Sequence, residues 1–213
     1  MKICLTVTGG TVSKEVFEAV LLEYKFDEII ACDKGIEACD SMGVMPDVVI
    51  GDFDSADNGI VDKYRDKARF INLKVHKNLT DTHVAVNYVI EHAFDEVIIL
   101  GATGTRADHM LANIGLLKLF TENNIRAYII DANNKITMTD KSCIINKSGK
   151  YKYVSLIPYT EQVKNLTLNG FYYECENINL TIGDSLGISN ELTESTGRIE
   201  FSQGLLIIIE SHD

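Results

Sequence analysis

This sequence lacks the features of membrane, disulfide-rich and nucleic-acid-binding proteins. No apolar run reaches the ~20 residues that a membrane-spanning helix requires, and the start MKICLTVTGG is typical of a buried strand rather than a signal peptide. The five cysteines are scattered and form no CxxC pair, so neither a disulfide framework nor a zinc site is indicated. A formal net charge of -11 without a local basic patch would repel a nucleic-acid backbone. We therefore expect a cytoplasmic globular protein that binds neither membranes nor nucleic acid.

The first two-thirds of the chain alternate short apolar runs with helical patterns. The predicted strands are the runs KICLTVT, DEIIACD, DVVIGD, RFINL, EVIILG and IRAYIID. The predicted helices are SKEVFEAVLLEYK, a short one ending near Met42, and two over about 81–93 and 107–120. The strands lack polar alternation, as expected when helices cover both faces of a sheet. This order predicts an α/β domain with a parallel sheet over residues 1–133.

Beyond about Asn133 the pattern changes to short apolar runs divided by Gly, Asn, Asp and Ser. These runs are KITMT, SCIIN, YVSLI, NLTLNG, NINLTI, RIEF and GLLIIIE. Such spacing predicts an all-β domain over residues 134–213.

Acidic side chains follow several of the predicted parallel strands. The loops concerned contain Asp33, then Asp52 with Asp54, then Asp81, and then Arg106 with Asp108 and His109. Residues two apart on an extended segment point to the same face, so the carboxylates of Asp52 and Asp54 would lie on one side of the segment. Because these like charges repel each other, the pair would need a bound cation or protons. The stretch with Asp52 and Asp54, taken alone, is also ordinary turn material, because Gly-Asp and Asp-Ser are common in turns. Because ligands collect at the carboxyl ends of parallel strands, the recurrence favours a functional site.

Carboxylate oxygens at such a site suit Mg²⁺, which keeps positions open for phosphate oxygens and water. The best ligand candidates are Asp52, Asp54 and Asp81. Asp81 is also placed to cap a helix, a role that Thr80 fits equally well. A carboxylate-rich magnesium site has no need of imidazole, so His83 and His109 are left outside the ligand set.

The stretch GATGTR, from Gly101 to Arg106, precedes a predicted helix, where backbone N–H groups favour an anion. We expect Gly101 and Thr103 to contact phosphate, although the stretch is neither a Walker A loop nor GxGxxG. The glycines Gly9 and Gly10 after the first strand are a weaker signal of the same kind. The guanidinium group of Arg106 can donate two hydrogen bonds to phosphate oxygens. Lys77 is either a second cation for phosphate or a solvated side chain.

Five stretches follow one another along the chain: ACDKG, MPDVVIGDFDS, NLTDT, GATGTRADHMLAN and LGISNE. Taken in this order, they resemble the thiamine pyrophosphokinase family. Its members transfer a diphosphoryl group from ATP to the thiamine hydroxyl and release AMP. The resemblance covers nearly the whole chain. It implies a Rossmann-like nucleotide domain, a C-terminal β-sandwich, Mg²⁺ as cofactor, ATP as co-substrate, and a homodimer with active sites between domains of opposite chains.

The resemblance also implies roles for individual residues. Magnesium and phosphate sites correspond to Asp52, Asp54, Thr80 and Asp81, with Arg106 near the phosphates, Asp108 near the thiamine pyrimidine, and Ser189 and Asn190 contacting thiamine. From the residues alone, Ser189 and Asn190 would be a β-turn. The expected reaction is in-line attack of the thiamine hydroxyl on the β-phosphorus of ATP, with Asp81 or Asp108 accepting the proton.

The sequence departs from the family in two places. Asn78 stands where the family's loop often has a first aspartate, and the chain has no tryptophan to stack on the thiamine ring, as some members do. A tyrosine, a phenylalanine or no aromatic residue takes its place. Two other functions remain open on the residues alone: a magnesium-dependent phosphohydrolase, and a non-catalytic thiamine or nucleotide sensor.

Overall fold

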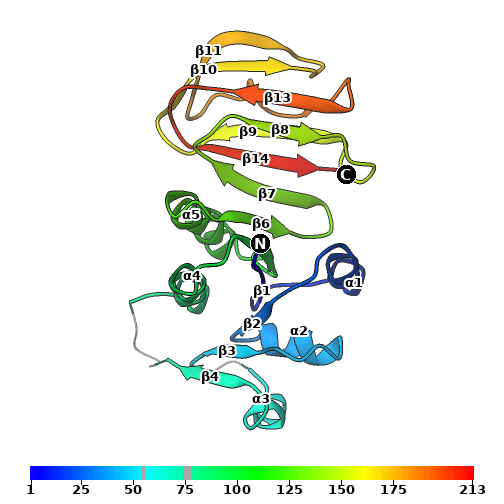
Figure 1. The fold of residues 1–213 in the computed structure, drawn as a ribbon, viewed down its shortest axis with the longest axis vertical. Coiled ribbons are helices and arrows are strands. Elements are labelled where there is room, and N and C mark those ends of the chain that lie inside the picture. Colours follow the sequence, from blue (N-terminus) through cyan, green and yellow to red (C-terminus); the bar gives the residue numbers. More distant parts are fainter. Residues whose placement is uncertain (54–55, 74–77) are drawn as a thin grey trace. The chain divides into compact units, whose positions relative to one another are not determined.

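The computed structural model describes residues 1–53, 56–73 and 78–213 (Figure 1). The chain divides into two units, Met1–Ala132 and Asn133–Asp213. Each unit contains its own cluster of buried apolar side chains. No helix built from the described residues is both long enough and apolar enough to cross a membrane.

Strands and helices alternate along the first unit. Its strands are β1 (Ile3–Val7), β2 (Glu28–Cys32), β3 (Val48–Gly51), β4 (Arg69–Asn72), β5 (Glu96–Leu100) and β6 (Arg126–Ile130). Its helices are α1 (Lys14–Glu23), α2 (Gly35–Ser41), α3 (Asn58–Tyr64), α4 (Asp81–Glu91) and α5 (Ala107–Glu122). The strands lie in the order β6-β5-β1-β2-β3-β4, and neighbours pair in parallel. The α/β fold with a parallel sheet is thus confirmed.

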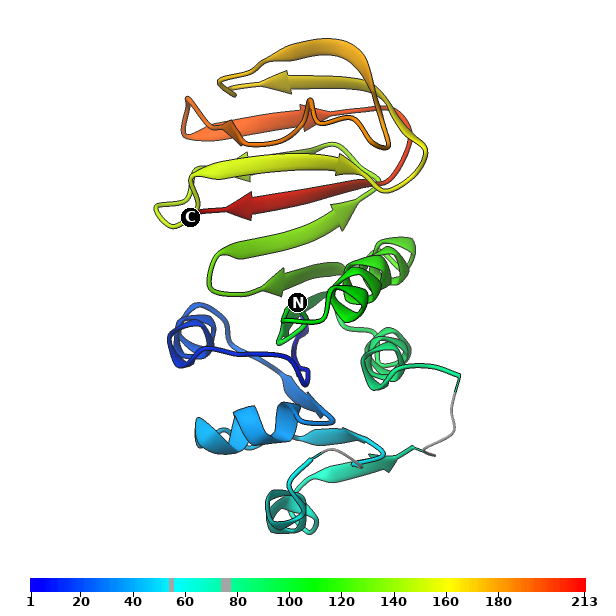
Figure 2. The same cartoon turned by 180° about the vertical axis from the view of Figure 1, so that it is seen from behind.

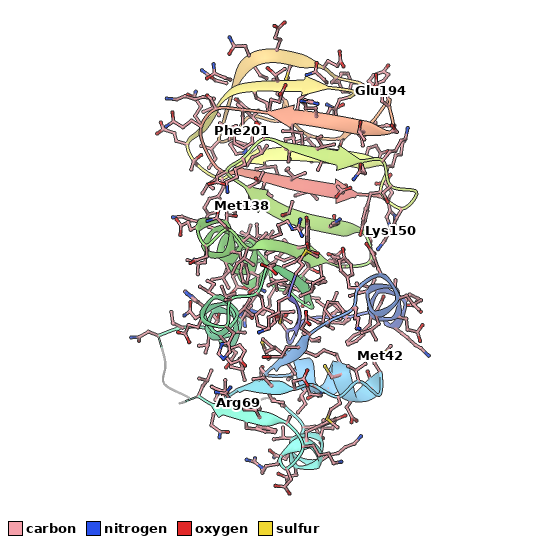
Figure 3. All side chains as sticks on the ribbon, viewed as in Figure 1. Met42, Arg69, Met138, Lys150, Glu194 and Phe201 are labelled. Atoms are coloured by element: carbon pink, nitrogen blue, oxygen red, sulfur yellow. The ribbon has the colours of Figure 1, made fainter. Side chains whose placement is uncertain are left out.

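Helices cover both faces of this sheet, with α1 and α2 on one side and α4 and α5 on the other (Figure 2). On the first face Leu5 and Val7 of β1 pack with Phe17 of α1 and Ile36 of α2. Side chains project from both faces of the strands into these helical layers (Figure 3). Complete burial of an apolar side chain such as Phe17 contributes about 1.5–3 kcal/mol to stability. Because helices cover both faces of the sheet, the strands carry apolar side chains on both faces.

Side-chain oxygens cap three of these helices. Ser13 Oγ accepts from Val16 N–H at the start of α1, Asp57 Oδ1 from Ile60 N–H at the start of α3, and Thr80 Oγ1 from His83 N–H at the start of α4. The sequence pattern does not predict α3, because its first two residues, Asn58 and Gly59, are poor helix formers that are typical of turns. The cap Asp57 was the available signal.

The second unit is a sandwich of antiparallel strands. These are β7 (Asn134–Thr139), β8 (Cys143–Asn146), β9 (Tyr153–Pro158), β10 (Gln162–Asn169), β11 (Cys175–Thr181), β12 (Asn190–Glu191), β13 (Thr196–Glu200) and β14 (Leu206–Ser211). One layer has the order β12-β9-β14-β7 and the other β11-β10-β13-β8. Side chains from both layers, including Leu156, Leu166 and Ile199, form the core between them. The β-sandwich is confirmed.

Gly35 at the start of α2 provides a test of how tightly this helix lies on the sheet. A Cβ at Gly35 would stand 2.0 Å from the carbonyl oxygen of Val7 on β1, so Gly35→Ala requires α2 to move away from the strand. Alanine is otherwise the better helix former. We expect the substitution to lower the free energy of unfolding, measured in urea, by about 1–3 kcal/mol.

Gly149→Ala is the matched control, because nothing lies within 4 Å of a Cβ built there. Equal stability of the two variants would contradict the close contact between α2 and β1.

Candidate active site

A cavity of about 530 Å³ lies in the first unit, where the carboxyl ends of β1, β2 and β5 meet the N-termini of α4 and α5. Its lining comprises Thr8, Gly9, Gly10, Thr11, Cys32, Asp33, Lys34, Thr80, Asp81, Thr82, Gly101, Ala102, Thr103, Gly104, Thr105, Arg106, His109, Met110 and Asn113. Several of the loops that the sequence marked as functional therefore share one cavity. This is the edge of a parallel sheet at which ligands bind.

The loops that follow β1 and β5 touch through their backbones. Thr8 N–H donates to the carbonyl oxygen of Leu100 at 2.8 Å, and Gly10 N–H donates to that of Gly101 at 3.0 Å. A Cβ at Gly10 would lie 2.1 Å from the same Gly101 oxygen, and Gly101 itself has φ +72°. Only glycine allows this approach.

Carboxylates occupy the neighbouring strand ends. Asp33 follows β2 with φ 48°, and its N–H donates to the carbonyl oxygen of Ile50 on β3 at 2.9 Å. Asp52 follows directly after β3, and both carboxylates are half-buried. Burial raises the pKa of the Cys32 thiol well above its usual value, and the negative charge of Asp81 raises it further. Asp81, at the start of α4, and Cys32, at the end of β2, line the same cavity.

The predicted metal site is only partly described. Asp54 and Lys77 lie outside the described residues, while Asp33 and Asp81 line the cavity. Within residues 1–53, 56–73 and 78–213, no three carboxylate, imidazole or thiol groups are grouped to hold a metal ion. The magnesium ligand set stays a prediction.

Arg106 and Asp108 form a two-point ion pair at the start of α5. Arg106 Nε–H donates to Asp108 Oδ1 at 3.2 Å and Nη2–H donates to Oδ2 at 2.6 Å. His109 N–H also donates to Asp108 Oδ1, at 2.9 Å. The Arg106 guanidinium, followed by the His109 N–H, lowers the pKa of the exposed Asp108 carboxyl from 3.8 to about 2. Asp108 thus pairs with an arginine that lines the cavity, and both side chains are largely exposed.

Other lining residues did not stand out in the sequence. Lys34 adds an exposed cation beside Asp33, and its position two residues after the end of β2 was the available signal. Met110 and Asn113 lie three residues apart on α5 and so share a helix face with His109. An apolar thioether and an amide on a helix give no local sign of ligand binding.

Ser189 and Asn190 belong to the second unit. Ser189 has φ 57° and its N–H donates to Ser155 Oγ at 3.0 Å. Asn190 lies on strand β12 with 5% exposure. Its Oδ1 accepts from Tyr173 N–H at 2.9 Å, and its Nδ2 donates to the carbonyl oxygen of Tyr173 at 2.8 Å. The Asn190 amide thus holds the backbone of Tyr173, whose side chain is 63% exposed and packs edge-on against Tyr172.

Comparison with protein-family models gives a match in each unit. The model of the thiamin pyrophosphokinase catalytic domain matches residues 21–129, and that of the thiamin pyrophosphokinase vitamin B1 binding domain matches residues 142–206. The thiamine pyrophosphokinase of Bacillus subtilis (strain 168) is 37% identical over 186 residues, which cover 86% of this chain and 87% of that protein. Thiamin pyrophosphokinase 1 of Caenorhabditis elegans is 26% identical over 174 residues, covering 78% and 70% of the two chains.

Solved structures agree with this result. The crystal structure of thiamine pyrophosphokinase from Bacillus subtilis superposes with a TM-score of 0.90 at 34% identity, covering 100% of both chains. The crystal structure of thiamin pyrophosphokinase from Geobacillus thermodenitrificans superposes with a TM-score of 0.87 at 30% identity, covering 99% of this chain and 98% of that chain. The similarity therefore extends over both units.

The ion pair predicts a specific titration. Arg106→Gln should return the pKa of Asp108 from about 2 toward 3.8, because the guanidinium is the largest cause of the shift. Since the folded-state pKa is the lower one, the pair's contribution to stability is present above the ordinary pKa and is lost as the pH falls through about 2. Carbon-detected NMR of the aspartate carboxyls measures the shift.

Arg65→Gln removes an exposed arginine that pairs with Asp62 instead and serves as the control. An Asp108 pKa that is the same in Arg106→Gln and in the unaltered protein would show that the pair does not form in solution.

Proposed function

The chain belongs to the thiamin pyrophosphokinase family and is a diphosphotransferase, and we propose that it transfers the diphosphoryl group of ATP to the hydroxyl of thiamine. The products would be thiamine diphosphate and AMP. One observation carries the proposal: carboxylates and an arginine line the same cavity in the unit that matches the catalytic domain.

The cavity suits a polyphosphate chain. Arg106 and Lys34 supply positive charge, and Arg106 keeps N–H donors beyond the two that it uses on Asp108. Arg106 makes no side-chain cap at the start of α5, where Asp108 Oδ1 accepts from the His109 N–H. We propose that Gly101 and Thr103 contact phosphate oxygens here.

The oxygen donors of the site fit a hard divalent cation. Asp33 and Asp81 present carboxylates to the cavity beside the Thr80 hydroxyl, and Asp52 follows the adjacent strand. We propose that Asp52, Asp54 and Asp81 hold Mg²⁺. When bound, the ion supplies positive charge that offsets the negative charge of the phosphates.

The chain's residues then act by positioning and by charge. The thiamine hydroxyl attacks the β-phosphorus in line with the departing AMP, while Arg106 offsets the negative charge that moves onto the leaving oxygens. A proton acceptor is needed for the hydroxyl. We propose that either Asp81 or Asp108 accepts this proton.

The second unit supplies our proposed thiamine contacts. Ser189 and Asn190 lie within the residues that match the vitamin B1 binding domain. Because the Asn190 amide is occupied by the backbone of Tyr173, we propose that Asn190 acts by positioning that segment. The exposed Tyr173 ring would then stack on the thiamine ring in place of a tryptophan. In a homodimer, these residues would serve the site of the opposite chain.

A single assay tests the function. With ATP, Mg²⁺ and thiamine, the protein should release AMP and thiamine diphosphate in equal amounts, resolved by chromatography. Asp81→Asn should lower turnover by roughly 10²-fold or more, because it removes charge that the site needs to balance the polyphosphate. Its stability should be unchanged or higher, since the substitution removes one of two like charges, Asp33 and Asp81, that line the same cavity.

Asp66→Asn changes an exposed aspartate outside the cavity and should leave turnover unchanged. Inorganic phosphate released without thiamine would instead support a phosphohydrolase, and binding without turnover a sensor. Undiminished turnover of Asp81→Asn at limiting magnesium would remove Asp81 from the proposed site.

The shared-site arrangement predicts complementation between chains. Asp81→Asn and Tyr173→Ala should each be nearly inactive at low thiamine. After subunit exchange, about half of the dimers are mixed, and each mixed dimer has one site with neither substitution. Roughly a quarter of the unaltered activity should therefore return, measured in the same assay. If exchange is verified by mass spectrometry and no activity returns, each site is contained in one chain.

A further inference from the structure

Asn113 lines the cavity from α5, on the helix face that also presents Met110. Its Nδ2 donates to the carbonyl oxygen of Ala102 at 2.9 Å. A carbonyl oxygen only accepts hydrogen bonds, so this contact identifies the amide nitrogen and fixes the orientation of the whole side-chain amide. Asn113 Oδ1 consequently faces away from Ala102, and it accepts no hydrogen bond from the residues that the structure describes.

The loop that anchors this amide is itself held in place. Ala102 is 3% exposed and follows Gly101, which is joined to the loop after β1 through the hydrogen bond from Gly10. An acceptor fixed in this way is preorganised for a ligand donor, because little side-chain freedom is lost on binding. The neighbouring Met110 offers an apolar, adaptable surface of the kind that packs against a flat ring.

We propose that Asn113 Oδ1 accepts a hydrogen bond from an exocyclic amine on a six-membered nitrogen heterocycle. This inference rests on the proposed function, whose two substrates each carry such a group: the adenine of ATP and the pyrimidine of thiamine. An amine donates to Oδ1, whereas an oxo group at the same ring position presents a second acceptor and is repelled. Asn113 would thus select amino over oxo rings at whichever substrate it faces.

Matched amino and oxo substrates test the proposal and distinguish the two sources. ATP is compared with inosine triphosphate, and thiamine with oxythiamine, by kcat/KM and by calorimetric binding. Asn113→Ala should lower the preference for the amino member of one pair by roughly three- to tenfold, the effect of one neutral hydrogen bond. Asn113→Asp keeps the acceptor and loses the donor to Ala102, so it should retain that preference.

Asn123→Ala is the matched control, because Asn123 also donates to a backbone carbonyl of α5, that of Leu119 at 2.8 Å, and does not line the cavity. A change confined to the nucleotide pair assigns Asn113 to the base, and one confined to the thiamine pair assigns it to the pyrimidine. If Asn113→Ala lowers the binding and kcat/KM of the amino and the oxo substrate equally in both pairs, Asn113 only anchors the loop and the proposal is overturned. If the unaltered protein makes no thiamine diphosphate, the proposed function fails. The ratio of the dissociation constants of the amino and oxo members of each pair still decides the role of Asn113.

Discussion

The cavity depends on the contact between the loops that follow β1 and β5. These strands are neighbours in a parallel sheet, so both loops leave the same edge, and the Gly10 N–H reaches the carbonyl oxygen of Gly101 at 3.0 Å. Side chains at these positions would push the loops apart. Because the loop after β5 leads into α5, the same contact sets the place of Arg106, Met110 and Asn113. The geometry of the site follows from two residues that carry no functional group.

The distribution of charge inside the cavity differs from that of the whole chain. The formal net charge is -11, yet the site combines Asp33 and Asp81 with Arg106 and Lys34. An anion entering such a cavity responds to the nearest charges, because more distant exposed charges are screened over about 8–10 Å at physiological salt. Arg106 uses two of its N–H donors on Asp108, and its other N–H donors are left for a ligand. An acidic protein can therefore present two cations locally, as the proposed phosphate contacts require.

In the second unit, hydrogen bonding decides how a polar residue contributes. Asn190 is nearly inaccessible, and a buried amide has to satisfy its donors and acceptor within the fold. It does so on the backbone of Tyr173, which leaves the tyrosine ring exposed. Asn190 thus braces the segment that displays an aromatic surface, and its expected contact with thiamine stays a prediction.

Local patterns in the sequence determined the fold class, because the period and composition of each apolar run report how that segment is buried. They predicted the parallel α/β sheet and the all-β second domain, and quoted motifs were enough to identify the family. Helix α3 was missed because Asn58 and Gly59, two poor helix formers, stand in its first turn. Only the tertiary structure brought Lys34, Met110 and Asn113 to the cavity, paired Arg106 with Asp108, and assigned the Asn190 amide to Tyr173. Such contacts depend on sheet order, backbone turns and the packing of segments remote in the chain, which no local pattern encodes.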